Sequence, residues 1–209
     1  MPPMRILIVT DAWRPQVNGV VRTLEKLAEA LHQRGVEVEF LTPEGYPTLP
    51  LPSYREIRLA LVTARQVAKR IEAVAPDSIH IATEGPLGIL ARRACLASGR
   101  TFTTSYHTRF PEFLSARTPV PESWSYACMR RFHNSGQGML VATPSLATEL
   151  DAKGFTNLKL WTRGVDTELF NPTKRIELDL PRPIFLNVGR VAVEKNLPAF
   201  LDLDLPGSK

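Results

Sequence analysis

Five short segments of this sequence carry the residues that could do chemistry, and each follows a stretch that reads as a β-strand. They are DAWRPQVNG (11–19), TEGP (83–86), SYHTRFPEF (105–113), TPS (143–145) and TRGVD (162–166). Together they hold a histidine, carboxylates, three arginines and glycine backbone, which are groups that bind phosphates and sugar hydroxyls. Because open α/β sheets bind ligands outside the carboxyl ends of their strands, we expect these segments to form one site.

The elements that position these segments alternate between strand and helix. Apolar or alternating patterns predict strands at residues 5–10, 36–42, 54–59, 78–83, 101–106, 139–142 and 158–161. Helical spacing of apolar residues predicts helices at residues 20–31, 63–74, 87–97, 121–134 and 146–153. A proline-rich loop is expected at residues 43–52. The alternation favours an α/β fold with a doubly wound, mostly parallel, Rossmann-like sheet.

Composition limits the class of protein without choosing a function. The 209 residues are 44% hydrophobic and 22% charged, which is typical of a globular protein. The net charge of +5 suits a phosphorylated substrate, an anionic membrane surface or a plain basic surface. Nucleic acid is disfavoured, because we find no basic helix, RNP-like aromatic pair or zinc module. No apolar run reaches membrane-spanning length and no signal peptide is recognised, so we expect a cytoplasmic protein with Cys95 and Cys128 as reduced core thiols.

The first segment ends in a glycine where a helix is predicted to begin. Backbone N–H groups at a helix N-terminus carry partial positive charge, and Gly19 would let a phosphate approach them closely. Asn18 can instead serve as an N-cap, so a structural explanation stays open. The sequence contains no GxGxxG after the first strand and no GxxxxGK[ST], which disfavours the common NAD and NTP sites.

The sequence changes in character after residue 172. Residues 1–172 read as one domain, residues 173–182 as a charged, proline-bearing linker, and residues 183–209 as the first strand, loop and short helix of a second domain. One strand and one helix cannot bury a core, so we expect the sequence to be truncated at its C-terminus or to be half of a larger unit. The DLD at residues 202–204 formally matches a metal-binding DxD pattern, and chance is the better explanation.

Five ordered stretches carry a resemblance to a known family. They are MRILIVTDAWRPQVNGVVRTLEKLAEAL, SYHTRFPEF, VATPS, TRGVDTELFNP and NVGRVAVEKN. In this order they resemble the GT-B glycosyltransferases of family 4, especially the GDP-mannose-dependent α-mannosyltransferases and the sulfoquinovosyltransferase-like enzymes. The similarity runs from residue 4 to about residue 198. Each stretch alone is weak, whereas their combination is specific.

The resemblance implies a retaining transferase of two Rossmann-like domains with the active site between them. The N-terminal domain would face the acceptor, and the C-terminal domain would hold the donor. Asn18 and Gly19 would face the donor's diphosphate and sugar. His107 would be the active-site histidine near the donor sugar, where it can donate to a hydroxyl or stabilise developing charge. Arg190 and Lys195 would grip the diphosphate, whose negative charge grows as it departs.

Three further residues are weaker candidates for this site. Arg163 would order the TRGVD loop, Asp166 would cap it, and Glu84 would lie in a loop on the acceptor side. The alternatives are a packing histidine at position 107 and solvated cations at positions 190 and 195. The Glu-rich donor motif of such enzymes would fall beyond the last residue, and Glu84 does not replace it. Structural roles are expected for His32, His80, His133, Thr143 and Ser145.

The expected function is transfer of a sugar, with mannose as the first choice, from a nucleotide diphosphate sugar to a lipid or glycan acceptor. GDP-mannose is the first candidate donor and a UDP-sugar the second, and neither a cofactor nor a metal is expected. The 209-residue chain alone is expected to have little activity. The rival hypothesis is a non-catalytic half, or a degenerate binding protein, that needs a separately encoded C-terminal domain.

Arginines lie beside aromatic residues in the middle of the sequence, a pattern that also occurs in surfaces that bind membranes. If they share one face, that face could rest on anionic lipid as a peripheral contact at the inner side of the membrane. A solvated basic surface is the alternative. The residues concerned are Arg92, Arg93, Arg109, Phe110, Phe113, Arg117, Trp124, Arg130 and Arg131.

Overall fold

A computed structural model describes residues 2–16, 18–51, 54–115, 118–189, 191 and 195–209 of the chain. These residues form two compact units, Met1–Arg163 and Gly164–Lys209. The division falls within the TRGVD segment, and the domain limits expected at residues 172 and 182 stay predictions.

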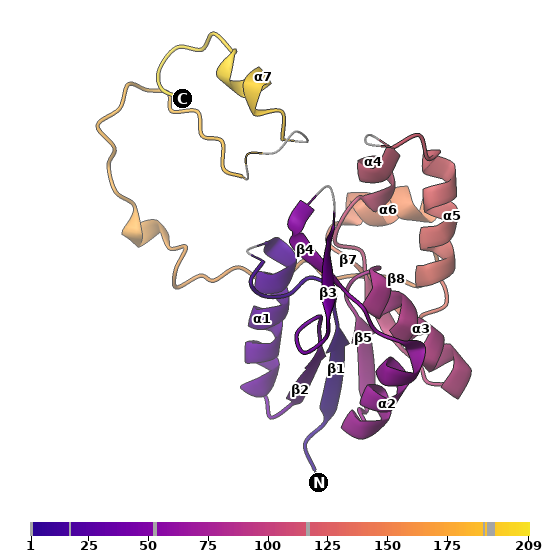
Figure 1. Cartoon of the computed structure of the whole chain (residues 1–209). Helices are drawn as coiled ribbons and strands as arrows, with labels where there is room; N and C mark the ends of the chain where they lie inside the picture. Colours follow the sequence, from indigo (N-terminus) through magenta and orange to yellow (C-terminus); the bar gives the residue numbers. More distant parts are fainter. Residues whose placement is uncertain (1, 17, 52–53, 116–117, 190, 192–194) are drawn as a thin grey trace. The chain divides into compact units, whose positions relative to one another are not determined.

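A six-stranded parallel sheet forms the centre of the first unit (Figure 1). Its strands lie in the order β2-β1-β5-β6-β7-β8. Their bounds are β1 Arg5–Val9, β2 Glu37–Leu41, β5 Ser78–Ile81, β6 Thr103–Ser105, β7 Gly138–Val141 and β8 Leu158–Leu160. The order reverses at β1, because β2 lies on one side of it and β5 on the other. Such a topological switch point is where open α/β sheets bind their ligands.

Helices cover both faces of this sheet (Figure 1). α1 (Gly19–His32) buries Leu24 in a cluster with Ile8 of β1, the partly buried Val38 and Phe40 of β2, and Ala82 just after β5. α2 (Ala64–Val74) and α3 (Pro86–Ser98) bury Val67 and their other apolar residues in a cluster with the opposite face of the same strands. Alternate residues of β1 enter the two clusters, as the period of a strand requires. The doubly wound α/β fold expected from the sequence is therefore confirmed.

Three more helices pack near the far end of the sheet. They are α4 (Phe110–Ser115), α5 (Glu122–His133) and α6 (Pro144–Ala152). A third buried cluster joins α5 and α6 to β7 and to the residue after β6. Its members are Tyr106, Tyr126, Met129, Met139, Val141, Leu150 and Phe155. This packing fixes the start of the segment that carries His107.

Three elements differ from the sequence-based expectation. β3 (Thr48–Leu51) pairs antiparallel with β4 (Tyr54–Ala60) in a separate two-stranded sheet, although the surrounding prolines predicted a loop. Pro50 is tolerated there because β3 is an edge strand. α4 also lies where a loop was expected. The strand expected from residue 184 is wrong for the described residues, since Ile184 forms only an isolated bridge with Ser208.

The second unit contains the short 3-10 helix η1 (Pro172–Lys174) and one further helix, α7 (Leu197–Leu201). None of its described residues is buried, and apolar side chains such as Leu186 and Val188 are 80% and 85% exposed. The described part of this unit therefore has no core of its own.

Both cysteines are free thiols. Cys95 is buried on α3, and burial raises the pKa of its thiol to about 11. Cys128 is exposed on α5, so the expectation of two core thiols is confirmed for Cys95 and wrong for Cys128. Within the described residues, no helix combines the length and the hydropathy needed to span a membrane.

Candidate functional site

The five predicted segments all begin at one edge of the sheet. They follow β1, β5, β6, β7 and β8, whose carboxyl ends point the same way because the strands are parallel. The segment after β8 reaches Arg163 within the first unit and continues into the second. The common edge expected from the sequence is therefore present. Some of its polar residues are bonded within the protein, and others have no partner among the described residues.

Asp11 lies at the switch point, and its carboxylate is used within the protein. Oδ1 accepts a hydrogen bond from the backbone N–H of Leu87 at 2.9 Å, and Oδ2 accepts from the Thr83 hydroxyl at 2.9 Å and the Gly88 N–H at 3.3 Å. Burial raises the pKa of the Asp11 carboxyl, although these hydrogen bonds act in the opposite direction. Asp11 thus occupies the N-terminal turn of α3, where a phosphate could otherwise bind.

Two glycines of the TEGPLG stretch allow this close approach. A Cβ on Gly88 would lie 1.9 Å from the carbonyl oxygen of Thr83, and a Cβ on Gly85 would lie 2.4 Å from Cγ of Asp11. Neither position accepts a larger residue unless the backbone or Asp11 moves. Packing against Asp11 therefore explains Gly85, and packing against the Thr83 carbonyl explains Gly88.

The long first segment is fastened to its neighbours. Trp13 packs on Phe40 of β2 with ring centroids 4.4 Å apart, and Arg14 pairs with Glu25 of α1 at 2.7 Å. With Asp11 bound to α3, the described part of the segment contacts three different elements. The start of α1 is thereby held in a defined place at the edge of the sheet.

Asn18 serves as the N-cap of α1. Its Oδ1 accepts hydrogen bonds from the backbone N–H groups of Val20 and Val21, each at 3.0 Å. Gly19 is different, because a Cβ there would meet no described atom within 4 Å and its φ lies outside the left-handed region. Neither packing against the described residues nor backbone conformation requires a glycine at this position.

His107 follows β6 and has both ring nitrogens buried. Neither Nδ1 nor Nε2 has a hydrogen-bond partner among the described residues, and such unpaired groups cost free energy. The ring lies edge-on to Trp161, with centroids 6.2 Å apart. Burial lowers the pKa of His107 to about 3, and the positive charge of Arg163 acts in the same direction. The imidazole is therefore neutral near pH 7, with one nitrogen able to donate and the other able to accept.

Arg163 and Asp166 fall on opposite sides of the division between the units. Arg163 has a φ of +56°, in the left-handed region that non-glycine residues rarely adopt. Strain of this kind collects at functional sites. Asp166 accepts a hydrogen bond from the Leu169 N–H at 2.9 Å, which is a capping interaction within the second unit.

His80 lies in the middle of the sheet, beneath this edge. Its Nδ1 and Nε2 contact the hydroxyls of Thr103 and Ser105, each at 2.9 Å. Burial lowers the pKa of His80 to about 4, so the ring is neutral near pH 7. These contacts fit the structural role expected from the sequence.

His133 connects the sheet to a candidate site residue, which the sequence did not suggest. The ring lies on α5 with no exposed side-chain area. Nδ1 lies 2.8 Å from the Thr104 hydroxyl of β6, and Nε2 lies 3.1 Å from Oε1 of Glu84. A residue interpreted as structural therefore contacts a carboxylate at the edge.

A charged network holds the segment that carries His107. The Arg109 guanidinium pairs with both carboxylate oxygens of Glu149, at 2.9 and 2.5 Å, and with Glu112 at 3.1 Å. Lys153 joins Glu149 at 3.0 Å and the Tyr126 hydroxyl at 2.6 Å. The hydrogen bonds from Arg109 are the main reason that the pKa of Glu149 falls to about 2. Arg109 and the carboxylates are partly exposed, so the network contributes more to geometry than to stability.

The remaining predicted positions are placed as follows. Thr143 caps α6 through a hydrogen bond from the Leu146 N–H at 3.2 Å, as expected. Lys195 is exposed in the second unit, and Arg190 lies outside the described residues. Within the described residues, no group of three or more histidine, cysteine or acidic side chains could hold a metal ion.

The arginines of the middle region do not all face solvent. Arg92 donates to the Ser135 hydroxyl and to the carbonyl oxygen of Arg131, each at 2.8 Å, and Arg130 donates to the carbonyl oxygen of Lys153 at 3.1 Å. Arg117 lies outside the described residues. These contacts leave fewer arginines for a lipid-facing surface than the sequence suggested.

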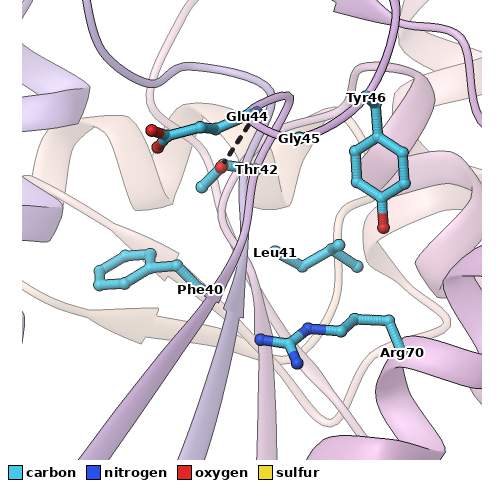
Figure 2. Close-up of a pocket in the computed structure, with 7 residues that line it drawn as sticks. All are labelled: Phe40, Leu41, Thr42, Glu44, Gly45, Tyr46 and Arg70. Atoms are coloured by element: carbon cyan, nitrogen blue, oxygen red, sulfur yellow. Dashed lines mark hydrogen bonds between the residues drawn. The ribbon is translucent and has the colours of Figure 1, made fainter.

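A hollow of about 350 Å³ opens at the carboxyl end of β2 (Figure 2). Figure 2 shows the Arg70 guanidinium below Leu41, and Arg70 also pairs with Glu39 at 2.9 Å. β1 and β5 separate β2 from β6, which carries His107. None of the residues that line this hollow was a candidate site residue from the sequence. They are Phe40, Leu41, Thr42, Glu44, Gly45, Tyr46 and Arg70.

Comparison with known proteins places this geometry among sugar transferases. Residues 17–169 match the family described as Glycosyltransferase Family 4. The chain is 29% identical over 223 residues to the sulfoquinovosyl transferase SQD2 of Arabidopsis thaliana, covering 93% of this chain and 43% of that protein. It is 26% identical over 230 residues to a GDP-mannose-dependent alpha-mannosyltransferase of Mycobacterium tuberculosis, covering 98% and 61%.

The chain spans about half the length of these curated relatives. A solved structure, the sucrose-phosphate synthase of Thermosynechococcus elongatus, aligns with a TM-score of 0.67 at 16% identity. That alignment covers 98% of this chain and 61% of the synthase, and it supports the fold alone.

Proposed function

The chain belongs to glycosyltransferase family 4, and from that premise we propose that it forms the acceptor-side part of a retaining glycosyltransferase. The enzyme transfers a sugar from a nucleotide diphosphate sugar to a hydroxyl of a lipid or glycan acceptor. GDP-mannose is the first donor to test, because several relatives bear the name GDP-mannose-dependent alpha-mannosyltransferase. A UDP-sugar is the second.

The observation that carries the proposal is His107. Its two ring nitrogens are buried and unpaired among the described residues, at the carboxyl edge of a parallel sheet. A neutral imidazole in this position can donate to one sugar hydroxyl and accept from another. It also supplies a fixed dipole where charge develops as the glycosidic bond breaks. Arg163, which acts on the pKa of His107, carries positive charge at the same place.

The start of α1 supports a diphosphate site. Gly19 leaves open space at the start of a 14-residue helix, and its own N–H has no partner among the described residues, whereas the N–H groups of Val20 and Val21 are taken by Asn18. A phosphate oxygen can approach the Gly19 N–H group closely. We also propose that Arg190 and Lys195 bind the donor and neutralise the departing diphosphate. We propose no metal or other cofactor, so transfer should persist in excess EDTA.

We further propose that the enzyme is cytoplasmic and meets its acceptor at an anionic membrane surface. The exposed face of α5 supports this, because Trp124, Ala127, Cys128 and Arg131 recur at helical spacing and all are exposed. Trp124 is 70% exposed. A large aromatic ring beside arginine suits a lipid headgroup region. Flotation with vesicles containing 30% phosphatidylglycerol should recover the chain, and Trp124→Ala should reduce recovery.

A donor screen tests the enzymatic proposal. The full polypeptide encoded by the gene is incubated with GDP-mannose, UDP-glucose and UDP-galactose and with dioctanoylglycerol or methyl α-D-mannopyranoside as acceptor. NMR of the product then gives the anomeric configuration. The proposal predicts one preferred donor and retention of its configuration. Inversion would refute the retaining mechanism, and no transfer from any nucleotide sugar would refute the function.

A further inference from the structure

We propose that Glu84 binds the acceptor hydroxyl and that the buried His133 is the positioning residue that orients it. This inference rests on the proposed function, and it adds the acceptor's binding group and its chemical class. The acceptor presents a neutral polyol, such as a glycerol or sugar hydroxyl, to Glu84.

Glu84 lies at the carboxyl edge of the sheet, in the segment between β5 and α3. It is the third residue after β5, at the switch point between β1 and β5 and next to Thr83, whose hydroxyl donates to Asp11. Its charge contributes to the raised pKa of Asp11, after burial and opposed by the hydrogen bonds that Asp11 receives. It also contributes to the raised pKa of Tyr106, the neighbour of His107. Glu84 therefore lies within electrostatic range of the groups on both adjoining strands.

The two carboxylate oxygens of Glu84 have different environments. Oε1 accepts from Nε2 of His133 at 3.1 Å, whereas Oε2 has no hydrogen-bond partner among the described residues. The side chain is 19% exposed, so one oxygen is held and the group still reaches solvent. A carboxylate held in this way can accept a hydrogen bond from a ligand hydroxyl at a fixed position.

The surroundings of His133 fix its ring in the position where Nε2 contacts Glu84. Its ring has no exposed area, and its Nδ1 is fixed by the Thr104 hydroxyl at 2.8 Å. Phe132, Tyr106 and Phe155 surround it, with ring centroids 5.0, 5.9 and 6.0 Å away. If Thr104 donates to Nδ1, Nε2 carries the proton and donates to the carboxylate.

Stability alone does not explain this choice of residues. A polar ring buried among aromatic side chains, and paired with a carboxylate, seldom stabilises a fold more than an apolar residue of similar volume would. The arrangement does fix one rotamer of Glu84, which is the property that a binding group requires.

The charge of Glu84 sets the chemical class of the acceptor. A carboxylate accepts hydrogen bonds from hydroxyls and repels phosphate. Acceptors with a neutral hydroxyl at the reacting position should therefore be used, and anionic headgroups at the same position should be rejected. The proposal concerns binding and orientation only, and it adds no covalent step to the transfer.

The experiment compares kinetic constants in the full polypeptide. Glu84→Gln keeps the shape of the side chain and removes its charge. Glu84→Asp keeps the charge on a side chain that is one methylene shorter. Both should raise the KM for the acceptor at least tenfold, while the KM for the donor and the slow hydrolysis of donor in water stay within twofold. His133→Gln should raise the acceptor KM in the same way. His80→Gln is the matched control, because His80 is also buried and its ring nitrogens contact hydroxyls only.

The acceptors tested are dioctanoylglycerol, methyl α-D-mannopyranoside and methyl α-D-mannopyranoside 6-phosphate, an anionic acceptor that keeps its ring hydroxyls, and the Tm of each variant is measured. Use of one neutral acceptor and not the other identifies the source of the hydroxyl. An unchanged acceptor KM in Glu84→Gln would overturn the inference while leaving the transferase intact. Equal use of the methyl mannoside and its 6-phosphate would overturn the assigned class. A wild-type enzyme that neither hydrolyses nor transfers the donor sugar would overturn the proposed function and this inference with it.

Discussion

Replacing Gly19 with alanine should separate the stability of the fold from the binding of the donor. The position begins α1, has no left-handed φ and has open space around it among the described residues. Alanine restricts the unfolded chain, so the free energy of unfolding should rise by about 0.4–1 kcal/mol. The methyl group would also keep a phosphate from the helix N-terminus. Loss of one hydrogen bond to a charged group costs about 1.5–3 kcal/mol. The nucleotide sugar should therefore bind roughly 10- to 150-fold more weakly.

Two measurements test this prediction. Urea denaturation of the 209-residue chain, followed by circular dichroism, gives the stability, and the KM for GDP-mannose in the full polypeptide gives donor binding. Gly35→Ala is the control, because Gly35 has a φ of +74° and lies past the other end of α1. That variant should lose stability and keep its donor KM. An unchanged donor KM in Gly19→Ala, or a clear loss of stability, would refute the reasoning.

Three other substitutions test the scaffold beneath the site. Gly88→Ala should destabilise the first unit by about 3 kcal/mol or more in urea denaturation, because its Cβ would clash with the Thr83 carbonyl oxygen. His80 has a pKa of about 4 in the folded protein and about 6.5 in the unfolded chain. As the pH falls below about 6.5, His80 is therefore protonated in the unfolded chain before it is protonated in the folded protein, which favours unfolding. The wild type should therefore lose about 2 kcal/mol between pH 7 and pH 5 that His80→Gln retains, as urea denaturation at both pH values would show. Arg109→Ala should change the free energy of unfolding by less than about 1 kcal/mol, since its pair with Glu149 is exposed. Its kcat should fall, because the segment that carries His107 is no longer tied to α6.

Much of the fold could be predicted from the sequence, because short apolar strands and amphipathic helices alternate with little interruption. β3 was missed because prolines normally interrupt sheets, and only its pairing with β4 shows that Pro50 lies in an edge strand. The strand expected from residue 184 had the right composition. A strand also needs a neighbour, and Ile184 finds only Ser208 among the described residues.

The site was predictable in its location and less so in its contacts. Parallel strands with polar residues after them indicate one edge, and His107 and Glu84 were placed there from the sequence. The contact between Glu84 and His133 spans 49 residues and joins a loop to a helix, so no local sequence pattern predicts it. Asp11 is the opposite case. An acidic residue after the first strand has the position and charge of a ligand-binding group, but its carboxylate is hydrogen-bonded to α3 within the protein.

His107→Ala in the full polypeptide tests the central claim most directly. Transfer of radiolabelled sugar from the preferred nucleotide sugar is measured together with the Tm of the variant. The account predicts that kcat falls at least 100-fold, about 2.7 kcal/mol of transition-state stabilisation, while the Tm does not decrease. Removal of a buried ring with two unpaired nitrogens should cost the fold little. Transfer at the wild-type rate, or a loss of activity that only follows a loss of folded protein, would contradict the account.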